Sequence, residues 1–149
     1  MIETKKNVMI STKLTVEEIN AQRKNTLIEL LGIEVTEIGE DFIIGTMPVD
    51  HRTHQPAGLL HGGASAAMIE SIGSLGSSFI VDRNKFGIVG IEINANHVRG
   101  VKSGIVSAHL QIVHCGKSTH IWQGTITDEE GNLVCTGRLT VLVVAKNRS

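Results

Sequence analysis

Apolar and polar positions alternate along the second half of the chain in four long runs. Alternation with a period of two predicts strands that each bury one face. The runs are GIVGIEINANHVR, GIVSAHLQIVHCG, STHIWQGTITD and LVCTGRLTVLVVA, separated by turns rich in Gly, Lys, Ser and Asn. Short turns between consecutive strands predict that these four strands form an antiparallel meander.

The first part of the chain predicts short helices followed by a hairpin. Thr15 and Glu18 have the spacing of a capping box, and the apolar positions after them predict one or two short helices that end at Gly32. Residues 33–49 then alternate in polarity and turn at 39–41. This pattern predicts two antiparallel strands.

Residues 62–81 form an apolar segment that follows a loop at 50–61. The segment contains one charge, Glu70, so a membrane span has to be weighed. Its many Gly and Ser residues and the carboxylate near its centre disfavour a span and favour a buried helix. Because helices and strands do not alternate, we expect an α+β fold in which this long helix is covered by a curved antiparallel sheet of about six strands.

The composition fits one globular domain over residues 1–149, with 41% hydrophobic and 19% charged residues. The net charge of −1 gives no basic field for nucleic acid. We expect residues 1–14 to form a flexible tail without a signal peptide. Cys115 and Cys135 lie outside any CxxC motif, so we expect reduced thiols and a cytoplasmic protein.

Other chemical motifs are weak. The seven histidines have no established zinc spacing, so no metal site is predicted. Ser65 and Ser71 do not lie in a GxSxG motif, and no GxGxxG motif joins a strand to a helix. Serine-hydrolase and dinucleotide-binding functions are therefore not supported.

Glu70 is the strongest candidate for chemistry. Its neighbours on the predicted helix are Ala, Ile and Gly, and no Lys or Arg lies within one helical turn. A buried carboxylate is costly unless it is paired or hydrogen-bonded. Glu70 is therefore either a structural group with a distant partner, or a general base or nucleophile.

His61, Gly62 and Gly63 precede Glu70 at the predicted start of the helix. Free N–H groups at a helix N-terminus can hold an oxyanion, although a Gly-Gly pair also suits a simple tight turn. Glu70 would lie about 12 Å along the helix axis from Gly62. If both act on one carbonyl, they must come from two antiparallel copies of the helix, which predicts a homodimer with shared sites. Small residues on the helix would permit close contact between helices or packing on the sheet: Ala64, Ala66, Ala67, Gly73 and Gly76.

Three segments resemble the hotdog-fold acyl-CoA thioesterases: MPVDHRTHQPAGLLHGGASAAMIESIGS, GIEINANHVR and HCGKSTHIW. The resemblance covers nearly the whole chain from about residue 15. It is to the branch with the phenylacetic-acid-pathway and Arthrobacter-type 4-hydroxybenzoyl-CoA thioesterases. Within that branch, the 1,4-dihydroxy-2-naphthoyl-CoA hydrolases of menaquinone biosynthesis are the most similar. The resemblance implies hydrolysis of an acyl-CoA to free acid and CoA, and a homodimer that pairs into a tetramer.

The resemblance also implies roles for individual residues. Glu70 matches the catalytic carboxylate, and the Gly62 N–H matches the donor to the thioester carbonyl. Gln55 matches a side chain that orients the carbonyl or the water. His61 lies where the family has a histidine near the thioester, and Ser74 matches a position that orients the water. The residues expected to contact the CoA nucleotide are His97, Arg99, Gly116, Lys117, Ser118 and Thr119.

No cofactor is expected, because CoA enters as part of the substrate. The acyl pocket is poorly defined by the sequence, which has no Tyr and one Trp. We expect aliphatic side chains such as Leu59, Met68 and Ile72 to line it, so aromatic specificity is implied by the resemblance alone. The alternatives are a broad salvage thioesterase, a hotdog hydratase, and a non-catalytic acyl-CoA sensor.

Overall fold

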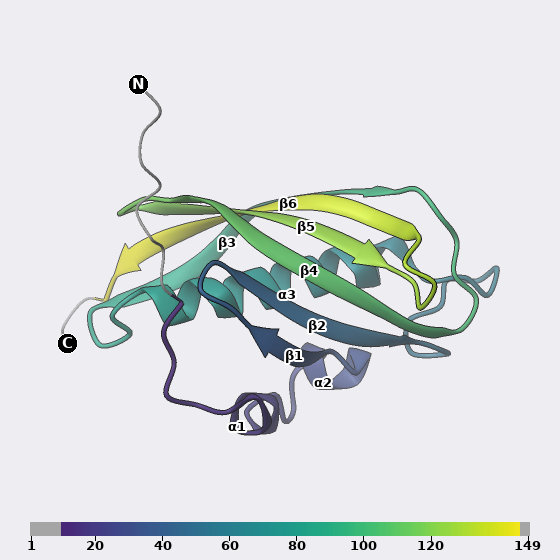
Figure 1. Cartoon of the computed structure of the whole chain (residues 1–149), viewed down its shortest axis with the longest axis horizontal. Coiled ribbons are helices and arrows are strands. Elements are labelled where there is room, and N and C mark those ends of the chain that lie inside the picture. Colours follow the sequence, from purple (N-terminus) through teal and green to yellow (C-terminus); the bar gives the residue numbers. More distant parts are fainter. Residues whose placement is uncertain (1–9, 147–149) are drawn as a thin grey trace.

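The computed structural model describes residues 10–146 of the chain. Figure 1 shows the strands arching over one long helix, α3, while two short helices lie beyond β1. The elements are α1 (Val16–Ala21), α2 (Leu27–Leu31), β1 (Glu34–Ile38), β2 (Phe42–Val49), α3 (Gly62–Ile80), β3 (Phe86–His97), β4 (Gly104–Cys115), β5 (Thr119–Thr127) and β6 (Leu133–Ala145). The predicted α+β class, with a long helix and six antiparallel strands, is confirmed.

The N-terminal region begins with the predicted capping box. The Thr15 hydroxyl accepts from the Glu18 N–H at 3.2 Å, and the Thr15 N–H donates to Glu18 Oε2 at 2.8 Å. α2 ends at Gly32, whose φ of 70° lies in the left-handed region. Ile10 is buried and its N–H donates to the Glu40 carbonyl at 2.9 Å. The last part of the expected tail, residues 10–14, therefore begins the packed fold, while residues 1–9 lie outside the described residues.

The sheet has the order β1-β2-β4-β5-β6-β3, and every neighbouring pair is antiparallel. The predicted meander is correct for β4, β5 and β6 but wrong for β3, which pairs with β6. β4 is already paired with β2 on one side and with β5 on the other. β3 therefore takes the free side of β6 and becomes an edge strand, and residues 98–103 cross the end of the sheet.

Glycines let α3 lie close against the sheet. A Cβ on Gly45 of β2 would lie 2.7 Å from Ile72 Cδ1, and one on Gly124 of β5 would lie 3.2 Å from the Ile69 side chain. On the helix, a Cβ on Gly76 would lie 2.6 Å from the Trp122 ring, and Gly73 packs against Leu139. Gly73 and Gly76 therefore serve sheet packing, the second of the two roles predicted for the small residues of this helix.

Ser77 ties the second half of α3 to β5 through a buried polar cluster. The Trp122 indole N–H donates to Ser77 Oγ at 2.8 Å, and His120 Nδ1 lies 3.0 Å from the same oxygen. All three side chains are fully buried. Burial lowers the pKa of His120, and nearby His114 lowers it further, while a hydrogen bond with the Gly116 backbone acts in the opposite direction.

In the part of the chain that the structure describes, no helix is long and apolar enough to span a membrane. Cys115 and Cys135 are both free thiols, in agreement with the sequence prediction.

We predict that the buried His120 makes the stability of the protein depend on pH. The pKa of His120 is lower in the folded protein than in the unfolded chain, so below about pH 6.5 the unfolded chain takes up a proton first. The free energy of unfolding should therefore decrease when the pH is lowered from 7.5 to 5.5. His120→Gln should make this decrease smaller. Urea unfolding at both pH values measures it. His109→Gln, at an exposed position on β4, should keep the wild-type fall; an unchanged fall in His120→Gln would contradict the prediction.

Candidate active site

The N-terminus of α3 carries the predicted oxyanion donor. His61 is the N-cap, and its Nδ1 accepts from the Gly63 N–H at 2.8 Å. The His61 carbonyl accepts from the Ala64 N–H at 3.0 Å and from the Ser65 N–H at 3.3 Å. Among residues 10–146, nothing accepts a hydrogen bond from the Gly62 N–H. This donor is therefore free at the positive end of the helix dipole, where it can bind a developing oxyanion.

His61 thus has a structural role that the sequence analysis missed. Because Nδ1 accepts a hydrogen bond, the proton of the neutral ring lies on Nε2. The ring is exposed beside the helix start, which leaves Nε2–H available to a ligand. A polar residue directly before a predicted helix is the usual signal for an N-cap, although Ser, Thr, Asp and Asn are the common choices.

His97 joins the same end of α3. It is the last residue of β3, and a Cβ placed on Gly62 would lie 2.5 Å from His97 Nε2. Gly62 therefore leaves room for the imidazole beside its own N–H. The resemblance implied that His97 contacts the CoA nucleotide, whereas the structure places it beside the predicted thioester site.

Gln55 lies in the loop before α3. Its side-chain oxygen accepts from the Ala57 N–H, and its backbone N–H donates to the Leu59 carbonyl at 2.8 Å. The resemblance left open whether Gln55 orients the carbonyl or the water. Because the oxygen is already engaged, the amide NH₂ remains, and it can donate to an oxygen of either group.

Glu70 lies on the half-buried face of α3, next to the edge strand. A Cβ on Gly90 of β3 would lie 2.6 Å from Glu70 Oε1. Across the described residues, the Glu70 carboxylate forms no ion pair and no side-chain hydrogen bond. Among residues 10–146, a structural role through a distant partner is therefore not supported. Ser74, one turn further on, is also half-buried.

One chain does not bring Glu70 and Gly62 to a common point. α3 is continuous from Gly62 to Ile80, so the two residues lie about 12 Å apart along its axis. The two residues also lie beside different parts of β3. Glu70 lies beside Gly90, and Gly62 lies beside His97. The free donor and the free carboxylate therefore belong to separate places on the surface of one chain.

The residues expected at the CoA nucleotide are divided between the two ends of the sheet (Figure 1). Arg99 follows His97 at the end where α3 begins, and it contributes to the lowered pKa of Asp128, whose main cause is the Asn132 side chain. Residues 116–119 form the β4–β5 turn at the opposite end, where the neighbouring His120 contacts Ser77 near the end of α3. A single chain therefore does not bring these residues together.

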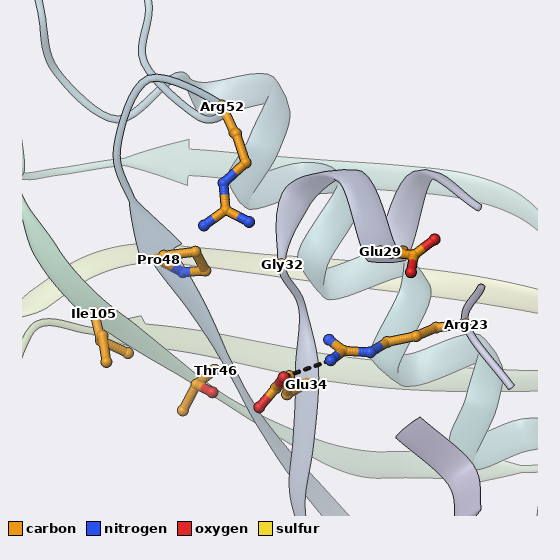
Figure 2. A pocket seen from close by; sticks show the side chains of 8 residues that line it. All are labelled: Arg23, Glu29, Gly32, Glu34, Thr46, Pro48, Arg52 and Ile105. Carbon is orange, nitrogen blue, oxygen red and sulfur yellow. Dashed lines mark hydrogen bonds and ion pairs between the residues drawn. The ribbon is translucent and has the colours of Figure 1, made fainter. Parts of the chain in front are cut away.

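Two of the three side chains expected to line the acyl pocket are buried within this chain, whereas Leu59 is half-buried. Met68 and Ile72 are 0% and 1% exposed and pack in the core. A pocket of about 290 Å³ lies elsewhere in the chain. Figure 2 shows its lining side chains, among which Arg23 pairs with Glu34. Arg52 pairs with Asp50 at 2.7 Å, so both cations are neutralised. The pocket is lined by Arg23, Glu29, Gly32, Glu34, Thr46, Pro48, Arg52 and Ile105, none of them a predicted site residue.

Residues 10–146 contain no group of three or more His, Cys, Asp or Glu side chains that could hold a metal ion. The polar groups at the candidate site are the free Gly62 N–H, two imidazoles (His61 and His97), the Gln55 amide, the Glu70 carboxylate and the Ser74 hydroxyl.

A curved antiparallel sheet wrapped around one long helix is the hotdog architecture, and here the helix carries a free N–H donor at its start and an unpaired carboxylate further along. Residues 57–135 match the thioesterase superfamily, and the chain belongs to this family of thioester hydrolases. It is 47% identical to the proofreading thioesterase EntH of Cronobacter turicensis over 131 residues, 88% of this chain and 95% of the relative.

Two solved structures are similar throughout. A mutant of thioesterase PA1618 from Pseudomonas aeruginosa superposes with a TM-score of 0.88 at 42% identity, over 91% of this chain and 97% of that one. Thioesterase HI1161 from Haemophilus influenzae gives a TM-score of 0.87 at 44% identity, over 93% and 95%. The hotdog fold predicted from the sequence is thereby confirmed.

We predict that His61 stabilises α3 through its cap. His61→Ala removes the acceptor for the Gly63 N–H and should lower the free energy of unfolding by about 0.5–2 kcal/mol. His61→Asn keeps a good cap and should lie close to wild type. Urea unfolding compares the three proteins. Equal destabilisation by Ala and Asn would show that the cap is not what His61 contributes.

Proposed function

We propose that this thioesterase hydrolyses an aromatic acyl-CoA, with 1,4-dihydroxy-2-naphthoyl-CoA as the leading substrate, to the free acid and CoA. The observation that carries the proposal is that the Gly62 N–H and the Glu70 carboxylate are both free of partners among the described residues. Family membership supports thioester hydrolysis. The aromatic acyl group, the CoA carrier and a cytoplasmic role in menaquinone synthesis rest on the resemblance of the sequence motifs.

In the proposed reaction, Glu70 takes a proton from a water molecule whose oxygen attacks the thioester carbonyl carbon. The carbonyl electron pair moves to oxygen, where the Gly62 N–H at the helix N-terminus holds the charge. Collapse of this intermediate breaks the C–S bond, and the thiolate of CoA takes the proton from Glu70. In this mechanism, the Gln55 NH₂ and the Ser74 hydroxyl orient the carbonyl and the water.

A second route uses the same residues. The Glu70 carboxylate attacks the carbonyl carbon, the thiolate leaves, and water then hydrolyses the resulting mixed anhydride. Both routes need one unpaired carboxylate facing one carbonyl, so the site geometry is compatible with each.

We propose that the site is shared between two chains. β3 is an edge strand, and its exposed side chains include Phe86, Val89 and Ile91, which are 37%, 48% and 54% exposed. An unpaired apolar edge favours pairing with another strand. A second copy of β3, antiparallel across a two-fold axis, would cover this edge and bring Glu70 of one chain toward Gly62 of the other.

This pairing would also bring together the residues that are expected to contact the CoA nucleotide but lie at opposite ends of the sheet. An antiparallel second chain reverses the ends of the sheet, so the Arg99 end of one chain lies at the same end as the 116–119 turn of the other. Residues from both chains can then contact one CoA. A further pairing of two dimers into a tetramer rests on the resemblance alone.

The substrate proposal is tested by a thiol-release assay across acyl-CoA substrates: dihydroxynaphthoyl, benzoyl, hydroxyphenylacetyl, and short and medium aliphatic. A strong preference for the bicyclic aromatic group supports the leading substrate. The similarity to a proofreading thioesterase favours a second candidate, the removal of wrongly formed thioesters, for which we expect broad activity across the series. A general salvage thioesterase would also show breadth. Binding without hydrolysis of any substrate would instead indicate an acyl-CoA sensor.

We predict that Glu70→Gln lowers kcat by about 10²–10⁴-fold, because the amide cannot accept the proton of water. KM and the urea midpoint should remain close to wild type, since Glu70 pairs with no other described side chain. Glu37→Gln, an exposed acid on β1, serves as the control and should keep full activity. A fully active Glu70→Gln protein would refute the proposed mechanism.

We predict that two inactive variants recover activity when mixed. Gly62→Pro removes the N–H at the first helical position, where Pro is tolerated, and the His61 ψ of 129° suits a following Pro. Glu70→Ala removes the carboxylate. After subunit exchange at equal concentrations, half of the dimers are mixed and each holds one intact site, giving about one quarter of wild-type activity.

The control for this experiment is Gly62→Ala, which crowds His97 similarly but keeps the N–H and should retain more activity than Gly62→Pro. Absence of recovery, with exchange confirmed by mass spectrometry, would place both groups of each site in one chain.

A further inference from the structure

We propose that Gly90 is a positioning residue that makes room for the Glu70 carboxylate. The inference rests on the proposed role of Glu70 in thioester hydrolysis. A Cβ on Gly90 would lie 2.6 Å from Glu70 Oε1, but 3.5 Å from Cδ and 3.6 Å from Cγ. Only the carboxylate end of the side chain therefore occupies the space that a Cβ at this position would need.

The strand places Gly90 at an inward-facing position. Ile88 and Ile93 on either side of it are half-buried and pack against the core, whereas Val89 and Ile91 are exposed. The alternation along β3 would ordinarily put an apolar side chain at residue 90. Glycine stands there instead, and the carboxylate from α3 fills the place of the missing side chain.

A β-bulge lies directly after this position. In the pairing with β6, Gly90 lies opposite Val141 and Glu92 lies opposite Thr140, so Ile91 is the extra residue. The bulge makes Ile91 and Glu92 consecutive outward positions and shifts the next inward one to Ile93. Bulges bend a strand and re-aim its side chains. Here the bulge and Gly90 together open a niche on the edge strand opposite Glu70.

An alanine in place of Gly90 separates positioning from stability. Its methyl group would force the Glu70 carboxylate away from β3, while the stem of Glu70 and the helix backbone keep ordinary distances. Alanine in a strand is not expected to be less stable than glycine there. A misplaced catalytic group can cost about 100-fold in rate, so activity should fall although the fold is retained.

The experiment compares Gly90→Ala with Gly87→Ala on the same strand. A Cβ on Gly87 would meet only Val144 Cγ2 at 3.5 Å and Lys146 Cε at 3.9 Å, both ordinary contacts. The substrate is the acyl-CoA that the wild-type protein hydrolyses fastest. We expect Gly90→Ala to lower kcat about 10–100-fold with a changed acid limb of the pH profile, and with KM, melting temperature and oligomeric state retained. Gly87→Ala should behave as wild type.

A double-mutant cycle with Glu70→Asp tests whether Gly90 acts through the carboxylate. Aspartate is one methylene shorter, so its carboxylate does not reach the methyl group that Gly90→Ala introduces. In the Glu70→Asp background, Gly90→Ala should therefore change kcat less than about twofold, which is strong non-additivity.

The positioning role is overturned if Gly90→Ala keeps wild-type kcat, if it lowers kcat equally in both backgrounds, or if Gly87→Ala causes the same loss. These outcomes differ from a failure of the proposed function, which would appear as full activity of Glu70→Gln. If Glu70→Gln is inactive while Gly90→Ala is normal, only the positioning role is wrong.

Discussion

The close contact between α3 and the sheet is the constraint on which the rest of the structure depends. Gly45, Gly124 and Gly76 leave no side chain where helix and strand backbones approach, so Ile69, Ile72 and Trp122 fill the remaining space. Interiors of this density tolerate little change in volume. The buried Ser77 hydroxyl, which receives the Trp122 N–H and contacts His120, fixes the helix along the sheet as well as against it.

This fixed helix has one face that the sheet does not fully cover, and the candidate chemistry lies on it. At its start, the His61 side chain and carbonyl accept from the N–H groups of Gly63, Ala64 and Ser65, while the Gly62 N–H has no acceptor among residues 10–146. Two turns further on, the Glu70 carboxylate rests against Gly90 of the edge strand. A rigid helix keeps these groups about 12 Å apart, so the distance that prevents a site within one chain is the same distance that a two-fold partner would have to bridge.

Many elements of the fold could be predicted from local patterns in the sequence. The capping box, the Gly32 helix end, the hairpin turn and the long helix each depend on a few neighbouring residues, and each was predicted correctly. The pairing of β3 with β6 could not be predicted in that way, because strand order depends on which edges are already occupied. The burial of Met68 and Ile72 could not be predicted for a related reason, since a helix sequence shows an apolar face without showing what covers it.

The sequence by itself determined the fold class, the family and the residue types available for thioester hydrolysis, because periodicity and short motifs are local properties of the chain. Only the tertiary structure decided how those residues are grouped. It placed His97 beside Gly62 and Glu70 beside Gly90, and it divided Arg99 from the 116–119 turn. These relations join positions far apart in the chain, and they follow from the crossing of α3 and β3 under close packing, which no local pattern records.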